Sequence, residues 1–290
     1  MTATAEIRQA LGRLGIWMPP MPALGLDPAQ FGKAIEAAGF RSVWFPEVNS
    51  PQSLEPLAAV LAATGRLIVG TGIASVWTWD PADLASRADR LSERYPGRFI
   101  LGLGNSHARM VESLGQAYEK PYSKMVQFLD AFPPTRTPVV LAALGPKMLR
   151  LARERALGAH PYFVPPGHTA FARRTLGPEP LLIPEVAVAL APGAEGEASA
   201  RTSAKYSLQL PNYTSNLKRL GFTDEDLGND GSPQLIKTII PYGPQPAAER
   251  IRQHLGAGAD HVVVQPLGEG GNFAPADLEK LAALVPDLLS

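Results

Sequence analysis

Acidic and histidine side chains at the ends of apolar segments are the first candidates for chemistry in this sequence. Glu47 follows the segment Ser42–Phe45, and His107 follows Phe99–Leu103 after a short turn that contains glycine. A histidine can donate a proton or hold a carbonyl oxygen, and a carboxylate can accept a hydrogen bond. Either side chain could instead cap a loop without touching a ligand. The pattern therefore favours acid–base chemistry or ligand binding, with loop capping as the alternative.

Glycine and tryptophan gather near the same segment ends. Gly70 and Gly72 lie in one apolar segment, and Gly102 and Gly104 lie in another. Glycine inside a strand often marks a bulge or a place where a ligand meets the backbone, although barrels also use small residues for closure. The four tryptophans fall at or just past the ends of the first three apolar segments. We interpret them as an aromatic cluster for a large planar ligand, with packing at the rim as the alternative.

Alternating strand and helix patterns must position these residues. Helix patterns separate nearly all of the short apolar segments, and two helices open with the pairs Asp27–Pro28 and Asp80–Pro81, which are typical caps. Eight apolar segments recur: Leu14–Met18, Ser42–Phe45, Leu67–Ile73, Phe99–Leu103, Val139–Ala142, His160–Val164, Leu181–Leu190 and His261–Gln265. Eight such units predict an α/β protein, a parallel (β/α)₈ TIM barrel, with its chemistry on the loops that follow the strands.

The interval between the last two apolar segments is too long for one crossover. Short helical patterns within residues 191–245 predict a helical insertion between strands 7 and 8 near the barrel mouth, whereas Gly193–Ala200 predicts a loop. The rest of residues 1–290 is predicted to form a single barrel domain. His160 and His261 are expected at strand starts with structural roles, and His254 is expected in solvent on an amphipathic helix.

Composition narrows the classes of partner. Lys and Arg together number 27, as do Asp and Glu, so nothing favours nucleic acid or an anionic membrane. The absence of cysteine excludes disulfides and thiolate chemistry. No apolar run is long enough to span a membrane, and the first ten residues lack a signal-peptide pattern. We expect a cytoplasmic protein with a small-molecule substrate, and we leave its oligomeric state open, a homodimer included.

The ordered motifs resemble the bacterial luciferase-like monooxygenase superfamily, and within it the probable coenzyme F420-dependent oxidoreductases. The resemblance covers nearly the whole chain, at residues 13–17, 39–44, 70–73, 96–104, 142–146, 161–166, 210–213 and 258–262. It implies a (β/α)₈ barrel with an insertion and a flavin-like ring held at the mouth. The implied cofactor is coenzyme F420, with FMN as the alternative, and the implied reaction is hydride transfer with a small organic substrate.

The resemblance also assigns roles to single residues. It implies a non-prolyl cis peptide at Gly72–Ile73 that supports the cofactor ring, and a turn before a helix whose N-terminus takes the cofactor phosphate. His107 is predicted as a catalytic residue from its position after a glycine-rich strand end, Glu47 is the second predicted catalytic residue, and no metal site is predicted. The implied cofactor-binding residues are Trp17, Glu47, Gly72, Ile73, Ala74, Gly104, Asn105, Ser106, Leu144, Gly145, Pro146, His168 and Thr169.

Two departures limit what the resemblance carries. The glucose-6-phosphate dehydrogenase branch has a histidine where this chain has Val48, and a glutamate where it has His107. Its sugar-phosphate chemistry is therefore not expected here. An FMN-dependent monooxygenase and a non-catalytic flavin- or deazaflavin-binding protein stay open as alternatives. An unrelated barrel lyase or metal hydrolase is disfavoured, because no Schiff-base lysine or His/Asp cluster appears at the strand ends.

Overall fold

The computed structural model describes residues 3–18, 27–46, 48–268 and 276–289. The strands are β1 (Leu14–Trp17), β2 (Ser42–Phe45), β3 (Ile68–Thr71), β4 (Ala74–Ser75), β5 (Phe99–Gly104), β6 (Val139–Leu141), β7 (Gly158–Ala159), β8 (Leu181–Leu182), β9 (Glu185–Ala189) and β10 (Val262–Leu267). The first helices are α1 (Ala3–Leu11), α2 (Pro28–Ala37), α3 (Glu55–Ala63), α4 (Pro81–Arg94), α5 (Ala108–Ser113), α6 (Pro121–Ala131), α7 (Pro146–Arg155) and α8 (Pro166–Leu176). The later ones are α9 (Gly193–Ser207), α10 (Pro211–Arg219), α11 (Asp224–Leu227), α12 (Pro233–Ile239), α13 (Pro244–Gly256) and α14 (Ala276–Leu284), with 3₁₀ turns at Pro51–Leu54 and Pro286–Leu288. Within these ranges, no helix is long and apolar enough to cross a membrane.

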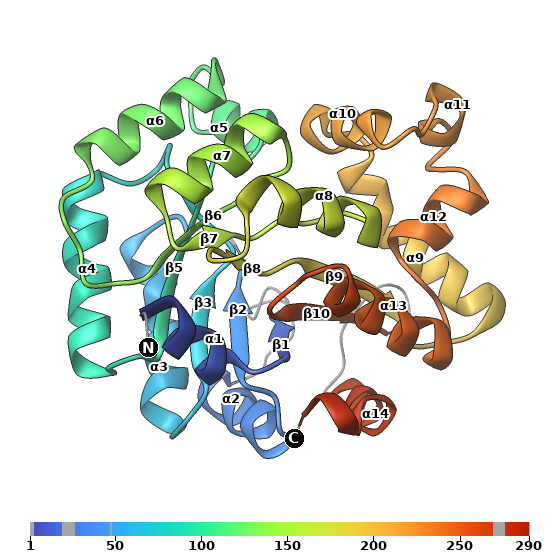
Figure 1. Ribbon diagram of the computed structural model, residues 1–290, viewed down its shortest axis with the longest axis horizontal. Helices are drawn as coiled ribbons and strands as arrows, with labels where there is room; N and C mark the ends of the chain where they lie inside the picture. The colour runs from blue at the N-terminus through green and yellow to red at the C-terminus, as the bar shows by residue number, and fades with distance from the viewer. Residues whose placement is uncertain (1–2, 19–26, 47, 269–275, 290) are drawn as a thin grey trace.

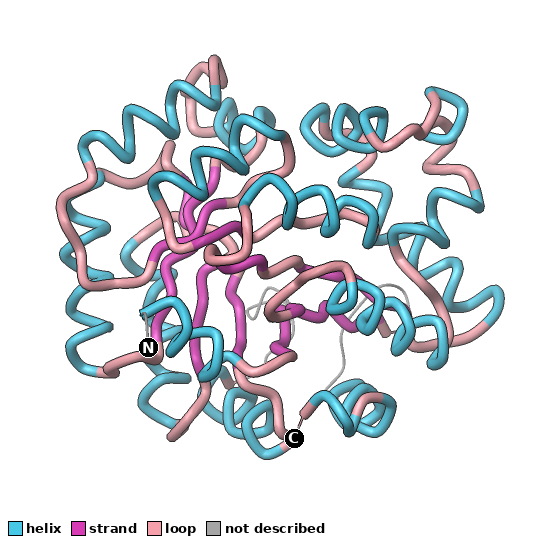
Figure 2. Tube along the Cα trace, in the orientation of Figure 1, coloured by secondary structure: helices cyan, strands magenta, loops and turns pink. Residues whose placement is uncertain are grey.

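All the strands run parallel, in the order β8-β7-β6-β5-β3-β2-β1-β10-β9, with β4 beside β5. The two end strands of this row are consecutive pieces of one segment, residues 181–189. On one side Ile183 N donates to Ala159 O (2.9 Å), and on the other Val263 N donates to Pro184 O (3.0 Å). Helices surround the strands (Figures 1 and 2). The predicted parallel α/β architecture is therefore confirmed.

Local sequence signals set the helix starts. The Asp80 carboxylate accepts hydrogen bonds from the backbone N–H groups of Ala82 and Asp83, and Asp27 accepts one from Gln30. Proline follows each capping aspartate at the first helical position, where its missing N–H costs nothing. Both predicted caps are confirmed, and they set the positions at which α2 and α4 begin.

The predicted strand His160–Val164 is wrong in its position. The strand in this region is β7, and His160 follows its last residue, with only an isolated bridge from Tyr162 to Glu185 beyond it. The backbone N–H of His160 still bonds Leu141 O (2.9 Å). Because the neighbouring strands are continuous apolar runs buried on both faces, their pattern does not reveal where pairing stops. His160 therefore lies at the carboxyl end of its strand.

Four helices, α9 to α12, lie between β9 and α13, on one side of the sheet (Figure 1). Their buried side chains form a second core that reaches Phe163 and the ends of β9 and β10. The loop predicted at Gly193–Ala200 is wrong, because α9 begins at Gly193. Ion pairing between Glu197 and Arg201 (2.8 Å) and a hydrogen bond from Ser199 to Gly268 stabilise this helix despite its glycines.

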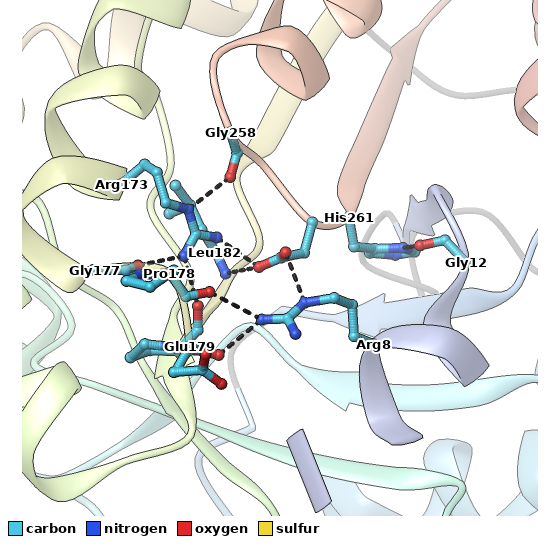
Figure 3. A network of polar contacts seen from close by, with 11 residues as sticks. Arg8, Gly12, Arg173, Gly177, Pro178, Glu179, Leu182, Gly258 and His261 are labelled. Carbon is cyan, nitrogen blue, oxygen red and sulfur yellow. Dashed lines mark hydrogen bonds and ion pairs between the residues drawn. The ribbon is translucent and has the colours of Figure 1, made fainter. Parts of the chain in front are cut away.

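A polar network ties the N-terminal helix to the end of the sheet from which the strands start (Figure 3). Both oxygens of the Asp260 carboxylate are used, one by Arg8 Nε (2.8 Å) and the other by Arg173 Nη2 (2.6 Å). The second oxygen also accepts from Leu182 N (2.8 Å). The Asp260 side chain is 14% exposed, so the carboxylate holds two cations in a largely dry position.

Replacing Asp260 by alanine is expected to lower the free energy of unfolding by about 3 kcal/mol. The substitution removes the carboxylate partner of two guanidinium groups and the acceptor of one backbone N–H. Urea denaturation measures the loss. Asp130→Ala is the matched control, because Asp130 pairs with Arg155 at 2.9 Å where both side chains are at least 40% exposed. That change should cost less than about 1 kcal/mol. Equal losses in the two variants would contradict a structural role for the network.

Candidate functional site

A cavity of about 800 Å³ lies where the carboxyl ends of the strands meet the following loops and the start of α10. Side chains of several strands form part of its lining: Trp17 ends β1, His160 follows β7 and Gln265 lies within β10. The turn after β5 and residues 210–213 form other walls. The cavity thus occupies the end of the sheet where a parallel α/β fold places its chemistry.

Most of the residues predicted for the cofactor meet in this cavity. Those that line it are Trp17, Gly72, Ile73, Asn105, Ser106, Leu144 and Gly145, together with the predicted catalytic residue His107. The peptide bond Gly72–Ile73 is cis, as predicted. Ser106 has a positive φ of 55° in the turn after β5. Glu47 lies outside the described residues.

Five other predicted residues do not line the cavity. Ala74 is fully buried in β4, where it pairs with Leu103 and belongs to the hydrophobic core. Gly104 ends β5, and a Cβ there would meet the Ile73 side chain at 2.5 Å. The remaining three are Pro146, His168 and Thr169.

These last three lie behind the cavity wall. Pro146 is the first residue of α7, directly after the lining residue Gly145. The Nε2 atom of His168 lies 2.8 Å from Leu144 O, so His168 supports the wall without forming its surface. Thr169 Oγ1 bonds the Nδ1 atom of His254 (2.8 Å). The solvated position predicted for His254 is wrong, since its side chain is fully buried against α8.

His107 stands at the N-cap position of α5, and its ring faces the cavity among aromatic side chains. The ring centroid lies 5.5 Å from that of Tyr213 and 6.1 Å from that of Tyr206. Burial lowers the pKa of His107, and a hydrogen bond with the Asn212 side chain opposes that shift. The imidazole is therefore neutral at pH 7, able to donate one N–H or to accept a proton.

Glu185 is the main acidic group that the sequence reasoning missed. It lines the cavity, is only 3% exposed, and has no ion-pair partner among the described residues. Burial raises the pKa of its carboxyl well above the usual range, and burial together with this carboxyl raises the pKa of Tyr162. Burial therefore favours the protonated carboxyl over the carboxylate. Its signal in the sequence was a single ionisable residue inside the apolar run Leu181–Leu190.

The aromatic cluster predicted at the mouth is only partly present. Of the four tryptophans only Trp17 lines the cavity, whereas Trp44 is fully buried below it and donates to Ser42 Oγ (2.9 Å). The glycines of β3 make room for these rings. A Cβ on Gly70 would meet Trp44 at 2.5 Å, and one on Gly72 would meet Trp17 at 2.2 Å. The glycine pattern therefore serves ring packing inside the sheet as well as the cavity surface.

Several buried polar atoms of the lining have no hydrogen-bond partner in the described part of the chain. They are Asn49 Oδ1, Asn105 Oδ1, His107 Nδ1, His160 Nε2 and Gln265 Oε1. Unpaired buried polar atoms are costly, so native proteins usually satisfy them with water or ligand. Their number and spread fit a ligand with several hydrogen-bonding groups, such as a flavin or deazaflavin ring with its hydroxylated chain.

A positive group lies at another part of the wall. Arg219, from the last turn of α10, lines the cavity, and its Nη2 would lie 3.4 Å from a Cβ on Gly145. Gly145 is the N-cap of α7, so a guanidinium and a helix N-terminus meet there. The described residues contain no cluster of three or more His, Cys, Asp or Glu side chains arranged to hold a metal ion. This corner suits an anionic group of an organic ligand.

Residues 27–133 match the sequence model of a family described as luciferase-like monooxygenase. A 5,10-methylenetetrahydromethanopterin reductase of Methanolobus tindarius is 29% identical over 164 residues, which are 48% of this chain and 50% of the relative. A putative coenzyme F420-dependent oxidoreductase of Mycobacterium tuberculosis is 32% identical over 119 residues, 41% of this chain and 33% of the relative. The matches thus span half the length of these curated relatives or less.

Solved structures extend the likeness in fold to nearly the whole chain. The coenzyme F420-dependent tetrahydromethanopterin reductase from Methanopyrus kandleri superposes with a TM-score of 0.76 at 18% identity, covering 96% of this chain and 99% of the other. An FMN complex of a type II Baeyer–Villiger monooxygenase from Pseudomonas putida has a TM-score of 0.65 at 14% identity, covering 96% and 97%. At these identities the structures support the shared fold alone.

Proposed function

We propose that this chain is an oxidoreductase of the luciferase-like monooxygenase family that transfers a hydride between coenzyme F420 and a small organic substrate, since residues 27–133 match that family's sequence model. The observation that carries the proposal is the cavity, which brings the backbone at Gly72 and Ile73 together with several unpaired polar atoms of its lining. A relative with an F420-dependent name gives further support.

The proposed cofactor site uses the residues that line the cavity. Gly72 and Ile73 would support the ring, and Asn105 and Ser106 would lie along it. The corner formed by Gly145, Arg219 and the start of α7 would take the phosphate. Glu47, which lies two residues after β2 in the sequence and outside the described residues, is proposed to accept a hydrogen bond from the ring or its hydroxyl chain. When bound, a deazaflavin supplies a ring position that gives or takes a hydride.

The protein side of the reaction falls to groups that hold and exchange protons. As a neutral imidazole, His107 would donate its N–H to a substrate oxygen and so hold a carbonyl in place. Glu185, whose pKa is raised by burial, would be the better proton donor when a carbonyl is reduced. This changes the role expected of His107 from proton donor to hydrogen-bond donor.

We further propose that residues 191–245 act as a helical insertion that covers the site. Residues 210–213, at the start of α10, contribute to the cavity lining, and α9 to α12 share a core with the ends of β9 and β10. Such a cover would keep water away from the reacting atoms. A cytoplasmic location and a homodimer belong to the same proposal.

Two other functions compete with this one. An FMN-dependent monooxygenase would bind its cofactor in the same cavity. This alternative is supported by the similarity in fold to a solved FMN complex. A non-catalytic flavin- or deazaflavin-binding protein would fill the cavity without turnover. Binding and reduction tests separate the three.

The purified protein is expected to bind oxidised coenzyme F420 with micromolar or better affinity and to bind FMN more weakly. Fluorescence quenching in parallel titrations with each cofactor measures this difference. Arg219→Ala should weaken binding of F420 by about tenfold and affect the phosphate-free deazaflavin riboside much less, since the guanidinium is assigned to the phosphate. FMN binding that equals or exceeds F420 binding would move the protein to the flavin branch. If the protein binds neither coenzyme F420 nor FMN, the proposed function is wrong.

A further inference from the structure

The His160 side chain presents a hydrogen-bond acceptor to the cavity. Its Nδ1 lies 2.7 Å from Ile183 O, and because a carbonyl oxygen only accepts, Nδ1 must carry the ring proton. Nε2 is then a bare acceptor. It is buried in a side chain only 3% exposed and has no partner in the described part of the chain. Burial lowers the pKa of His160 to about 4, so the ring remains neutral and Nε2 keeps its lone pair at pH 7.

The direction of this lone pair is fixed by packing. The Trp44 ring stacks on the imidazole with centroids 4.6 Å apart and planes 22° apart, and Trp17 lies at 6.0 Å and 28°. Nε2 also lies 3.0 Å from the position that a Cβ on Gly72 would occupy. Protein therefore fills these sides of the ring, and the cavity is where a donor for Nε2 has room to enter.

The acceptor also limits what can lie beside it. A bare lone pair repels carboxylate and phosphate oxygens and favours an N–H, whereas the Arg219 guanidinium attracts anions. His160 adjoins Gly72, and Arg219 adjoins Gly145, so different parts of one cavity favour opposite kinds of group. A ligand that fits both has an anionic tail and a planar ring with an N–H on its edge.

We propose that Nε2 of His160 accepts a hydrogen bond from a ring N–H of the planar ligand bound beside Gly72 and Ile73. The site would thereby select rings of the imide type, in which one N–H lies between two carbonyl groups. The inference rests on the proposed function, because flavin and deazaflavin rings carry an N–H of this kind. It assigns a ligand contact to a residue that the sequence alone indicated as structural.

The test compares oxidised deazaflavin riboside with its analogue methylated at the imide nitrogen. Wild-type protein is expected to bind the methylated ring at least tenfold more weakly in fluorescence titrations. His160→Phe keeps the flat ring between the tryptophans but removes the acceptor. It should bind the unmethylated ring about tenfold more weakly than wild type, and its preference between the two rings should shrink to about twofold or less.

His254→Phe is the matched control. His254 is as fully buried as His160, and its Nε2 also has no partner in the described residues, but it does not line the cavity. This variant should retain wild-type discrimination between the two rings. Circular dichroism and thermal melting check that each variant is folded. If His160→Phe does not fold, His160→Gln, which keeps an acceptor at a similar reach, should preserve the preference for the unmethylated ring.

The outcomes separate this inference from the proposed function. Equal binding of the two rings by wild-type protein would overturn the His160 assignment and leave the cofactor class intact. A His160→Phe protein that discriminates as wild type does would also overturn it. If wild type binds neither deazaflavin nor FMN, the proposed function fails and the assignment fails with it.

Discussion

Replacement of His107 by alanine is expected to lower kcat by about 10²-fold while the affinity for the cofactor changes little. The imidazole lies in the cavity wall, and burial lowers its pKa, so in the proposed reaction it would act as a neutral hydrogen-bond donor. Because the neutral form is the working one, the rate should stay constant above the ordinary histidine pKa and fall only in more acid solution. Stopped-flow measurement of hydride transfer with a reducible substrate tests both statements.

Two further variants make the His107 result specific. Tyr206→Phe removes a hydroxyl from a neighbouring ring 6.1 Å away that does not line the cavity, and it should leave kcat nearly unchanged. Glu47→Ala should instead weaken cofactor binding, since the cofactor is its proposed partner. A His107→Ala protein that transfers hydride at the parent rate would show that the substrate oxygen is held by another group.

Substitution of Glu185 by glutamine is expected to lower kcat by about 10² to 10³-fold, because a carboxamide cannot supply a proton. Burial raises the pKa of this carboxyl, so its acid form persists to higher pH than that of an exposed glutamate. The wild-type rate should therefore fall as the pH rises through the raised pKa, and the variant should lack that step. An unchanged rate in Glu185→Gln would remove Glu185 from the chemistry.

The same carboxyl should affect stability, which can be measured without a substrate. A group whose pKa is higher in the folded than in the unfolded protein gives stability that is fully present below the unfolded pKa. That contribution is lost as the pH rises through the folded value. Urea denaturation across the pH range should show wild type losing stability toward alkaline pH relative to Glu185→Gln. Parallel curves for the two proteins would mean that the carboxyl ionises freely in the fold.

The sequence by itself determined the parallel α/β architecture and the segments whose ends carry the site. Continuous apolar runs predict buried parallel strands, and the capping pairs at Asp27 and Asp80 predict helix starts, because both depend on neighbours within a few residues. The ordered motifs also identified the position of the cis bond at Gly72–Ile73 and the turn that carries His107. These features depend on residues that are close together in the chain, so they can be recognised from the amino-acid sequence.

The tertiary structure alone decided which polar side chains enter the cavity. Glu185 and His160 lie in segments that read as strands, and only the pairing shows that β7 stops before His160 and that Glu185 faces inward. Thr169 and Ala74 were near the expected site in sequence, yet the Thr169 side chain bonds His254 and Ala74 belongs to the hydrophobic core. The physical reason is that the faces of a strand alternate with every residue. Small differences in where pairing ends therefore decide whether a side chain lines a cavity or joins the core.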